Sequence, residues 1–279
     1  MKVLGLGDNV VDKYEHIQTM YPGGNALNFA VYAKRLGVDA AYLGAFGSDA
    51  EAAHVLDSIE QIGLDISHCK HYQGENGCAR VTLKEGDRVF VGSNKGGVLR
   101  EHGLQLTAED LEYIQGFDLV HAGLYGYTQP ELPRIKELGV PISFDFSSDF
   151  TEQQVNEIAP LVNYAFFSCS HLNEQEVQEL MVNVTNMGCE LVLCTMGEEG
   201  AILFDGSSVY TQEPKLVKAL DTMGAGDSFL TCFLIHFMKK KKEGRLDQEA
   251  MIVESLTEAA DFSSKQCLVE GSFGFGKVY

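Results

Sequence analysis

DTMGAGDSF, residues 221–229, joins a glycine-rich turn to an apolar helix that we expect to begin near Ser228. The first N–H groups of a helix lack intrahelical partners and carry the positive end of its dipole, so an anion is stabilised there. Gly224 and Gly226 have no Cβ and let backbone N–H groups approach phosphate oxygens closely. The stretch therefore predicts a phosphate site where a loop enters a helix.

Asp227 follows these glycines and would lie beside a phosphate bound to them. A carboxylate in that place can accept the proton of an attacking hydroxyl, which is the task of the base in phosphoryl transfer. Asp is also favoured as a helix cap, so a purely structural role is the alternative. The residue types alone leave both roles open.

The composition narrows the class of protein. With 279 residues and 45% hydrophobic content, the chain suits one large domain or a large domain with a small appendage. The formal net charge of −19 argues against nucleic acids and anionic membrane surfaces as partners. Seven cysteines form neither a paired disulfide framework nor a CxxC motif, which suits a reducing compartment. With no signal-peptide pattern and no apolar run long enough to span a bilayer, we expect a cytoplasmic protein.

Most of the chain alternates short apolar strands with helices. Strands are expected at 3–6, 41–46, 119–122, 142–146, 164–167 and 191–194, a pattern that favours a mostly parallel sheet covered by helices. Ligands bind at the carboxyl ends of such strands, and polar residues follow several of them: Asp8, Asn9, Asp12, Asp145 and Thr195. Two segments, 13–22 and 77–93, do not fit that layer. We expect them to form a small β lid inserted in a single α/β domain over residues 1–279.

The chain resembles the ribokinase (pfkB-type) family of ATP-dependent sugar kinases along nearly its whole length. The resemblance rests on the early segment Gly23, Gly24, Asn25 and on the late DTxGAGD segment, which are separated by a β lid and a run of α/β units. It implies a three-layer α/β sandwich with a mostly parallel central sheet. It also implies that Asp227 is the catalytic base and that the N–H groups of Gly224, Ala225 and Gly226 form an anion hole for the γ-phosphate.

The same resemblance implies where the ligands bind. Carboxylates offer acceptors and amides offer both donors and acceptors, which suits residues that grip sugar hydroxyls, here Asp12, Gly24, Asn25 and Asn28. ATP would lie against Thr195, Gly197 and Gly200, and the C-terminal GSFGFG segment, with Gly274, would close the adenine pocket. Plain turn glycines are the alternative for these positions.

Two cations are expected. Mg²⁺ neutralises charge between the β- and γ-phosphates, and the family's NxxE segment would correspond to Asn173 to Glu176. That segment begins several residues after its strand ends, so a helix-opening Asn with nearby acids is the structural alternative. The family also uses a monovalent cation near the anion hole. Asp221 would be a ligand of such an ion, K⁺.

Six segments resemble family members that act on fructoselysine, a lysine glycated through its ε-amine: GDNVVD at 7–12, GGNALNFAVY at 23–32, DISH at 65–68, DRVF at 87–90, VHAG at 120–123 and FDFS at 144–147. The first lid excursion is short, which would admit a bulky amine-linked substrate. Arg88 and Tyr14 are candidates for substrate contact, with ordinary exposed lid residues as the alternative.

The expected reaction is transfer of the γ-phosphate of ATP to a primary hydroxyl, with O6 of fructoselysine as the expected acceptor. A free sugar such as fructose or ribose, or another fructosamine, remains an alternative substrate. A non-catalytic sugar or nucleotide sensor with the same fold is the rival from another class. The exposed strands of the lid also allow a homodimer.

Overall fold

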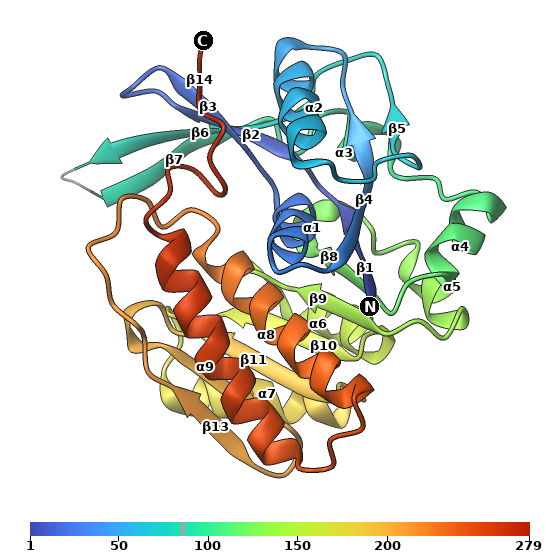
Figure 1. Cartoon of the computed structure of the whole chain (residues 1–279), viewed down its shortest axis with the longest axis vertical. Coiled ribbons are helices and arrows are strands. Elements are labelled where there is room, and N and C mark those ends of the chain that lie inside the picture. Colours follow the sequence, from blue (N-terminus) through green and yellow to red (C-terminus); the bar gives the residue numbers. More distant parts are fainter. Residues whose placement is uncertain (85–86) are drawn as a thin grey trace.

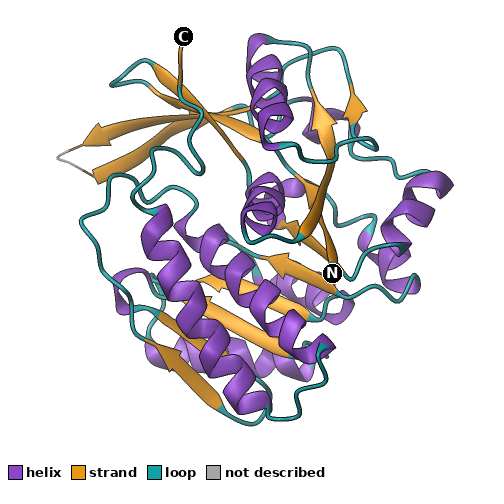
Figure 2. Ribbon diagram, in the orientation of Figure 1, coloured by secondary structure: helices purple, strands orange, loops and turns teal. Residues whose placement is uncertain are grey.

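The computed structural model describes residues 1–84 and 87–279, and the side chains of all of these except 83, 84, 87 and 88. A large, mostly parallel sheet runs through the molecule (Figures 1 and 2). Its strands, in spatial order, are β13 (Val209–Gln212), β12 (Ala201–Phe204), β11 (Leu191–Thr195), β10 (Tyr164–Ser168), β9 (Ile142–Asp145), β8 (Leu119–Gly123), β1 (Lys2–Gly7), β4 (Asp39–Phe46) and β5 (Lys70–His71). Strand β12 pairs antiparallel with both of its neighbours.

Helices cover both faces of this sheet. One face packs against α1 (Asn25–Arg35), α2 (Ala50–Ile62), α8 (Ala225–Lys242) and α9 (Gln248–Gln266). The other packs against α3 (Val98–His102), α4 (Ala108–Gln115), α5 (Leu132–Glu137), α6 (Glu152–Ile158) and α7 (Glu174–Asn186). Short 3₁₀ turns lie at η1 (Leu124–Gly126), η2 (Ala159–Leu161) and η3 (Gly197–Glu199). Because successive residues such as Val3 and Leu4 enter opposite cores, the central strands are apolar throughout.

A second, smaller sheet lies at one end of the large one (Figure 1). Its order is β14 (Lys277–Val278), β3 (Thr19–Gly23), β2 (Val10–Tyr14), β6 (Gly77–Lys84) and β7 (Asp87–Ser93). The segments 13–22 and 77–93 lie in this sheet, which we call the lid sheet. The predicted fold class, a mostly parallel α/β sheet with a small second sheet, is confirmed. The division of the chain into one domain with an inserted lid stays a prediction.

The start of α1 is fixed against the end of β1. Gly24 precedes the helix with φ 112°, and the N–H groups of Asn25 and Ala26 donate to the Asp8 carboxylate at 2.8 and 3.2 Å. A Cβ on Gly5 would lie 2.1 Å from the Ala26 carbonyl oxygen, so α1 packs directly on the backbone of β1. These contacts place the first turn of α1 at the carboxyl end of the central strands.

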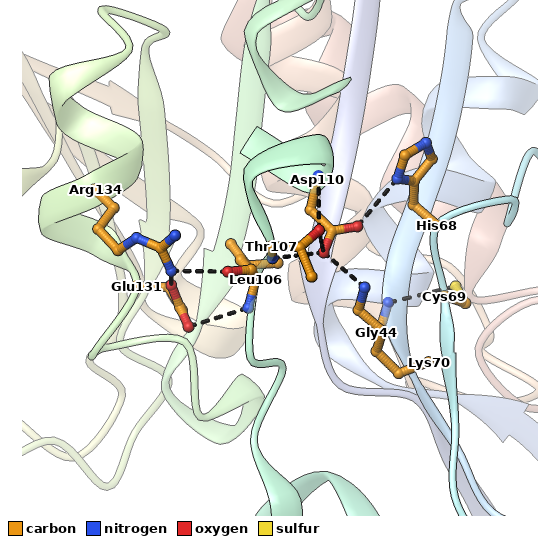
Figure 3. Close-up of polar contacts among 9 residues, drawn as sticks. All are labelled: Gly44, His68, Cys69, Lys70, Leu106, Thr107, Asp110, Glu131 and Arg134. Atoms are coloured by element: carbon orange, nitrogen blue, oxygen red, sulfur yellow. Dashed lines mark hydrogen bonds and ion pairs between the residues drawn. The ribbon is translucent and has the colours of Figure 1, made fainter. Parts of the chain in front are cut away.

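A buried ion-pair cluster joins α4 to the segment after α2 (Figure 3). Asp110 accepts hydrogen bonds from Lys70 Nζ at 2.6 Å and from the Thr107 N–H at 2.8 Å, and it contacts His68 Nδ1 at 3.0 Å. Burial opposes ionisation, but these partners hold the pKa of Asp110 below its usual value. Its contribution to stability is therefore fully present above the pKa of the unfolded carboxyl and is lost as the pH falls below it.

Candidate active site

The turn of the DTMGAGD stretch ends in a left-handed residue. Gly224 caps α8 with φ 71°, and a Cβ there would lie 2.4 Å from Tyr32 Oη. The helix begins at Ala225, three residues before the expected Ser228, because this left-handed turn lets the chain enter the helix at once. Asp227 consequently lies in the first turn. Within the described part of the chain, the N–H groups of Gly226 and Asp227 have no acceptor, whereas that of Ala225 donates to the Thr222 carbonyl at 3.2 Å.

Two amides hold the carboxylate of Asp227. Asn25 Nδ2 donates to Oδ1 at 2.8 Å, and Asn28 Nδ2 donates to Oδ2 at 2.5 Å. Burial raises the pKa of Asp227 to about 6, although both amide hydrogen bonds act in the opposite direction. A carboxylate with a pKa of about 6 is largely ionised at neutral pH yet is a better proton acceptor than an exposed one.

A cluster of polar side chains, Asp12, Asn28 and Ser272, lies near this carboxylate. A Cβ on Gly23 would lie 2.9 Å from Asp12 Oδ2, 3.3 Å from Ser272 Oγ and 3.9 Å from Asn28 Oδ1, so these three oxygens surround one backbone position. Asp12 and Asn28 are 4% and 3% exposed. Among the described residues, Asn28 Oδ1 has no hydrogen-bond partner, as expected of an acceptor reserved for a ligand hydroxyl.

The other predicted sugar-binding residues are placed differently. Gly24 passes close to the backbone of Asn9, whose Cα would lie 2.8 Å from an added Cβ. The side-chain amide of Asn25 contacts Asp227, Asp145 and His121. The side chain of Arg88 lies outside the described residues.

A cavity of about 460 Å³ opens on the other side of the α8 N-terminus. Its lining includes the predicted nucleotide residues Thr195, Gly197 and Gly200, and the anion-hole residues Ala225 and Gly226 form part of its wall. Apolar surface comes from Phe229, Leu216 and Val217, and the end of α9 adds Ser263, Ser264 and Cys267. This volume and mixed lining are typical of a small-molecule site. Gly274 is not part of the described lining.

The C-terminal GSFGFG segment contacts α1 close to Asp227. Among the described residues, none of this segment lines the cavity. Tyr32 Oη donates to the Ser272 carbonyl at 2.5 Å, and Asn28 Nδ2 reaches Ser272 Oγ at 3.2 Å. The chain then pairs with the lid sheet through β14, against β3. Neither contact was predicted, because the glycine and aromatic pattern of GSFGFG carries no signal for a partner far away in the sequence.

The three candidate cation ligands all form hydrogen bonds within the protein. Asn173 and Glu176 form a reciprocal capping box at the start of α7, with Asn173 Oδ1 accepting from the Glu176 N–H at 3.1 Å and Glu176 Oε2 accepting from the Asn173 N–H at 2.8 Å. Asp221 Oδ2 accepts from Tyr14 Oη at 2.6 Å and from the Gly271 N–H at 2.9 Å. Tyr14 therefore ties the lid sheet to the anion-hole turn.

Two further residues contact Asn25 beside Asp227: His121, which sequence alone missed, and Asp145, which was expected at a strand end but without a role. His121 is completely buried in β8, and burial lowers its pKa to about 3. Asp145 ends β9, where burial, followed by the charge of Asp227, raises its pKa to about 7. The strand-end position of Asp145 was visible in the sequence. A histidine inside an apolar strand gives no comparable signal.

Fold and site together are typical of a phosphotransferase for a small polar acceptor: a buried carboxylate with a raised pKa lies in the first turn of a helix, next to a cluster of polar side chains, and Gly226 of the same turn lines a nucleotide-sized cavity. A family model described as "pfkB family carbohydrate kinase" matches residues 2–271. The chain belongs to this family, and it is an ATP-dependent carbohydrate kinase.

Two named kinases and one solved structure are similar to this chain. Fructosamine kinase FrlD of Bacillus subtilis strain 168 is 42% identical over 280 residues, which cover 100% of this chain and 95% of that protein. Fructoselysine 6-kinase of Escherichia coli K12 is 33% identical over 235 residues, covering 84% of this chain and 88% of that protein. The solved structure of ribokinase from Giardia lamblia superimposes with a TM-score of 0.77 at 18% identity and covers 96% of this chain and 91% of its own. At that identity it supports the fold alone. In the described part of the chain, no helix is long and apolar enough to cross a membrane.

Proposed function

We propose that the protein transfers the γ-phosphate of ATP to the 6-hydroxyl of a fructosamine, with fructoselysine as its natural substrate. The observation that carries the reaction is the position of Asp227 in the first turn of α8, hydrogen-bonded to Asn28 of the polar cluster and adjacent to Gly226, which lines the nucleotide-sized cavity. The two similar proteins named for fructosamine and fructoselysine support the acceptor.

In this proposal the sugar binds at the polar cluster. Asp12 and the backbone at Gly24 hold its hydroxyls, and Asn28 Oδ1 accepts from one of them. The acceptor hydroxyl faces Asp227. As its oxygen forms a bond to the γ-phosphorus, the bond from that phosphorus to the β-phosphate oxygen of ADP breaks, and the hydroxyl proton passes to the Asp227 carboxylate. The N–H groups of Gly224, Ala225 and Gly226 stabilise the charge that develops on the transferred group.

The nucleotide occupies the large cavity, with its phosphates toward α8. Thr195, Gly197 and Gly200 line the wall against which it lies. We assign Gly274 to the adenine side on its sequence position alone. Carboxylate and amide oxygens at Asn173, Glu176 and Asp221 are the donor types that hard cations prefer. We assign the first two to Mg²⁺, which supplies charge neutralisation between phosphates when bound, and Asp221 to K⁺.

Arg88 and Tyr14 are the lid residues assigned to the substrate side. The Tyr14 side chain reaches the anion-hole turn through Asp221, so its hydroxyl lies where lid and turn meet. We assign Arg88 on its sequence position alone.

The lid sheet also supports a homodimer. Strand β7 is an edge of that sheet, and its residues Val89, Phe90 and Val91 are 37%, 61% and 50% exposed. An exposed apolar edge strand is a template for pairing with a second copy. Sedimentation of the purified protein should therefore give twice the chain mass; a single-chain mass across micromolar concentrations would contradict the pairing.

The substrate assignment is tested by ADP release from Mg²⁺-ATP with matched concentrations of fructoselysine, glucoselysine, fructose, ribose and no acceptor. We expect kcat/KM to be highest for fructoselysine, because the short first lid excursion admits the lysine portion. A higher value for another acceptor would keep the kinase mechanism and change its substrate. If no acceptor stimulates ADP release, the proposed substrate class is wrong.

A further inference from the structure

The side chain of Asn25 lies at the meeting point of four elements. Its Nδ2 donates to Asp227 Oδ1 on α8 at 2.8 Å and to Asp145 Oδ2 on β9 at 2.7 Å. Its Oδ1 lies 3.0 Å from His121 Nε2 on β8, and His121 Nδ1 lies 2.9 Å from Ser143 Oγ. Both polar atoms of this amide are therefore engaged, by three protein groups of which two are carboxylates.

One pattern of hydrogens satisfies every contact. The amide must direct its two N–H bonds at the two carboxylates, because the opposite orientation would set its oxygen against both of them. Its oxygen then faces His121, which must donate from Nε2. Since His121 is neutral at ordinary pH, its Nδ1 is an acceptor and takes the Ser143 hydroxyl hydrogen. That hydroxyl lies farther, 3.4 Å, from the Val120 carbonyl.

His121 is itself held firmly. It is completely buried and stacks on Phe29 of α1, with ring centroids 4.5 Å apart. It is therefore out of reach of any bound ligand and can act on the reaction only through Asn25. The two hydrogen bonds that link Ser143, His121 and the Asn25 amide fix which end of that amide faces Asp227.

We propose that Asn25 is a positioning residue for the catalytic base, and that His121, supported by Ser143, locks the Asn25 amide with its donors toward Asp227 and Asp145. This inference rests on the proposed function, because it concerns the base of that reaction. It gives Asn25 a role through Asp227 rather than through direct contact with the sugar.

The electrostatic consequence has a definite sign. Three titratable groups face Asp227: Asp8 directly after β1, Asp145 on β9 and Tyr32 on α1. His121 reaches it only through Asn25. A hydrogen bond donated to the ionised Asp227 carboxylate lowers the pKa of Asp227. Without the Asn25 donor between them, the negative charges of Asp227 and Asp145 also repel each other more strongly. Loss of the locked amide therefore raises the pKa of Asp227. The acid limb of the pH–rate profile then moves to higher pH.

A matched pair of variants tests the lock. His121→Gln places an amide N–H donor near the position of Nε2, whereas His121→Met has a similar length and no donor. We expect the acid limb of kcat/KM to stay near that of the wild type for the Gln variant. For the Met variant we expect it to move up by about one pH unit, the equivalent of one hydrogen bond to a charged group, with about a fivefold loss of kcat/KM at pH 6. The KM for ATP should change little in either.

The remaining outcomes separate the two proposals. If the wild-type enzyme phosphorylates no fructosamine, the proposed substrate fails, and the pH profiles are measured with whichever sugar is accepted. If the Gln and Met variants have the same acid limb, the lock is wrong. Should neither variant fold by thermal melting, Asn25→Ala removes the amide directly from the half-buried start of α1. A raised sugar KM with an unmoved acid limb in that variant would indicate sugar contact and overturn the positioning role.

Discussion

Asp227→Asn should lower kcat by about 10²- to 10⁴-fold, the usual cost of losing a general base. Asn has the same shape and keeps an oxygen that can accept from Asn25 or Asn28, so the first turn of α8 and both compartments should persist. The variant loses the capacity to take the hydroxyl proton and one of the two amide hydrogen bonds, because its own NH2 group cannot accept from the second amide. The dissociation constants of ATP and sugar should therefore stay within a few-fold of the wild-type values.

The measurement compares single-turnover rates with calorimetric binding of each ligand. Asp145→Asn is the matched control, because Asp145 is a second buried carboxylate with a raised pKa that shares the same Asn25 donor. Its turnover should fall by less than that of Asp227→Asn, since Asp145 lies at the end of β9 and not in the first turn of α8. A larger loss for Asp145→Asn would transfer the role of base to that residue.

The sequence was sufficient for the features that are local in the chain. The apolar strand runs, the glycine turn and the carboxylate after it are separated by a few residues, and short-range geometry relates them. Even there, the start of α8 was expected near Ser228 and lies three residues earlier, at Ala225, because the left-handed Gly224 leads directly into the helix. The antiparallel strand β12, which lies between β11 and β13, and the terminal strand β14 were not predicted. They are four and two residues long, and strands this short carry little periodicity.

The environment of the base could not be predicted in the same way. Asn25 and Asp227 are 202 residues apart in the chain, and Asn25 and His121 are 96 apart. Only the parallel sheet, with β8 and β9 side by side and α1 beginning at their carboxyl ends, brings them within hydrogen-bonding distance. Asn25 was correctly picked out as a residue of interest through its GGN segment. Its partners depend on tertiary structure, which spacing does not encode.

Gly224→Ala and Gly226→Ala should affect stability in opposite directions. At Gly224 the left-handed conformation costs an alanine about 1–2 kcal/mol, and the new Cβ would lie 2.4 Å from Tyr32 Oη, which adds about 1–3 kcal/mol of overpacking. At Gly226 an added Cβ meets no atom of the described protein within 4 Å, and alanine favours the helix by about 0.5–1 kcal/mol. Urea denaturation should show a destabilised first variant and an unchanged or stabilised second one.

The kinetic effect of Gly226→Ala should nevertheless be large. Gly226 is exposed, lines the nucleotide-sized cavity and presents an N–H group without an acceptor among the described residues. A methyl group there stands in the space through which a phosphate would approach that N–H group, so we expect kcat/KM for ATP to fall at least about tenfold, as for loss of one preorganised donor. A well-folded Gly226→Ala enzyme with wild-type kcat/KM would show that phosphate does not approach α8 at this residue. Since the same variant folds at least as stably as the wild type, such a result could not be attributed to a damaged structure.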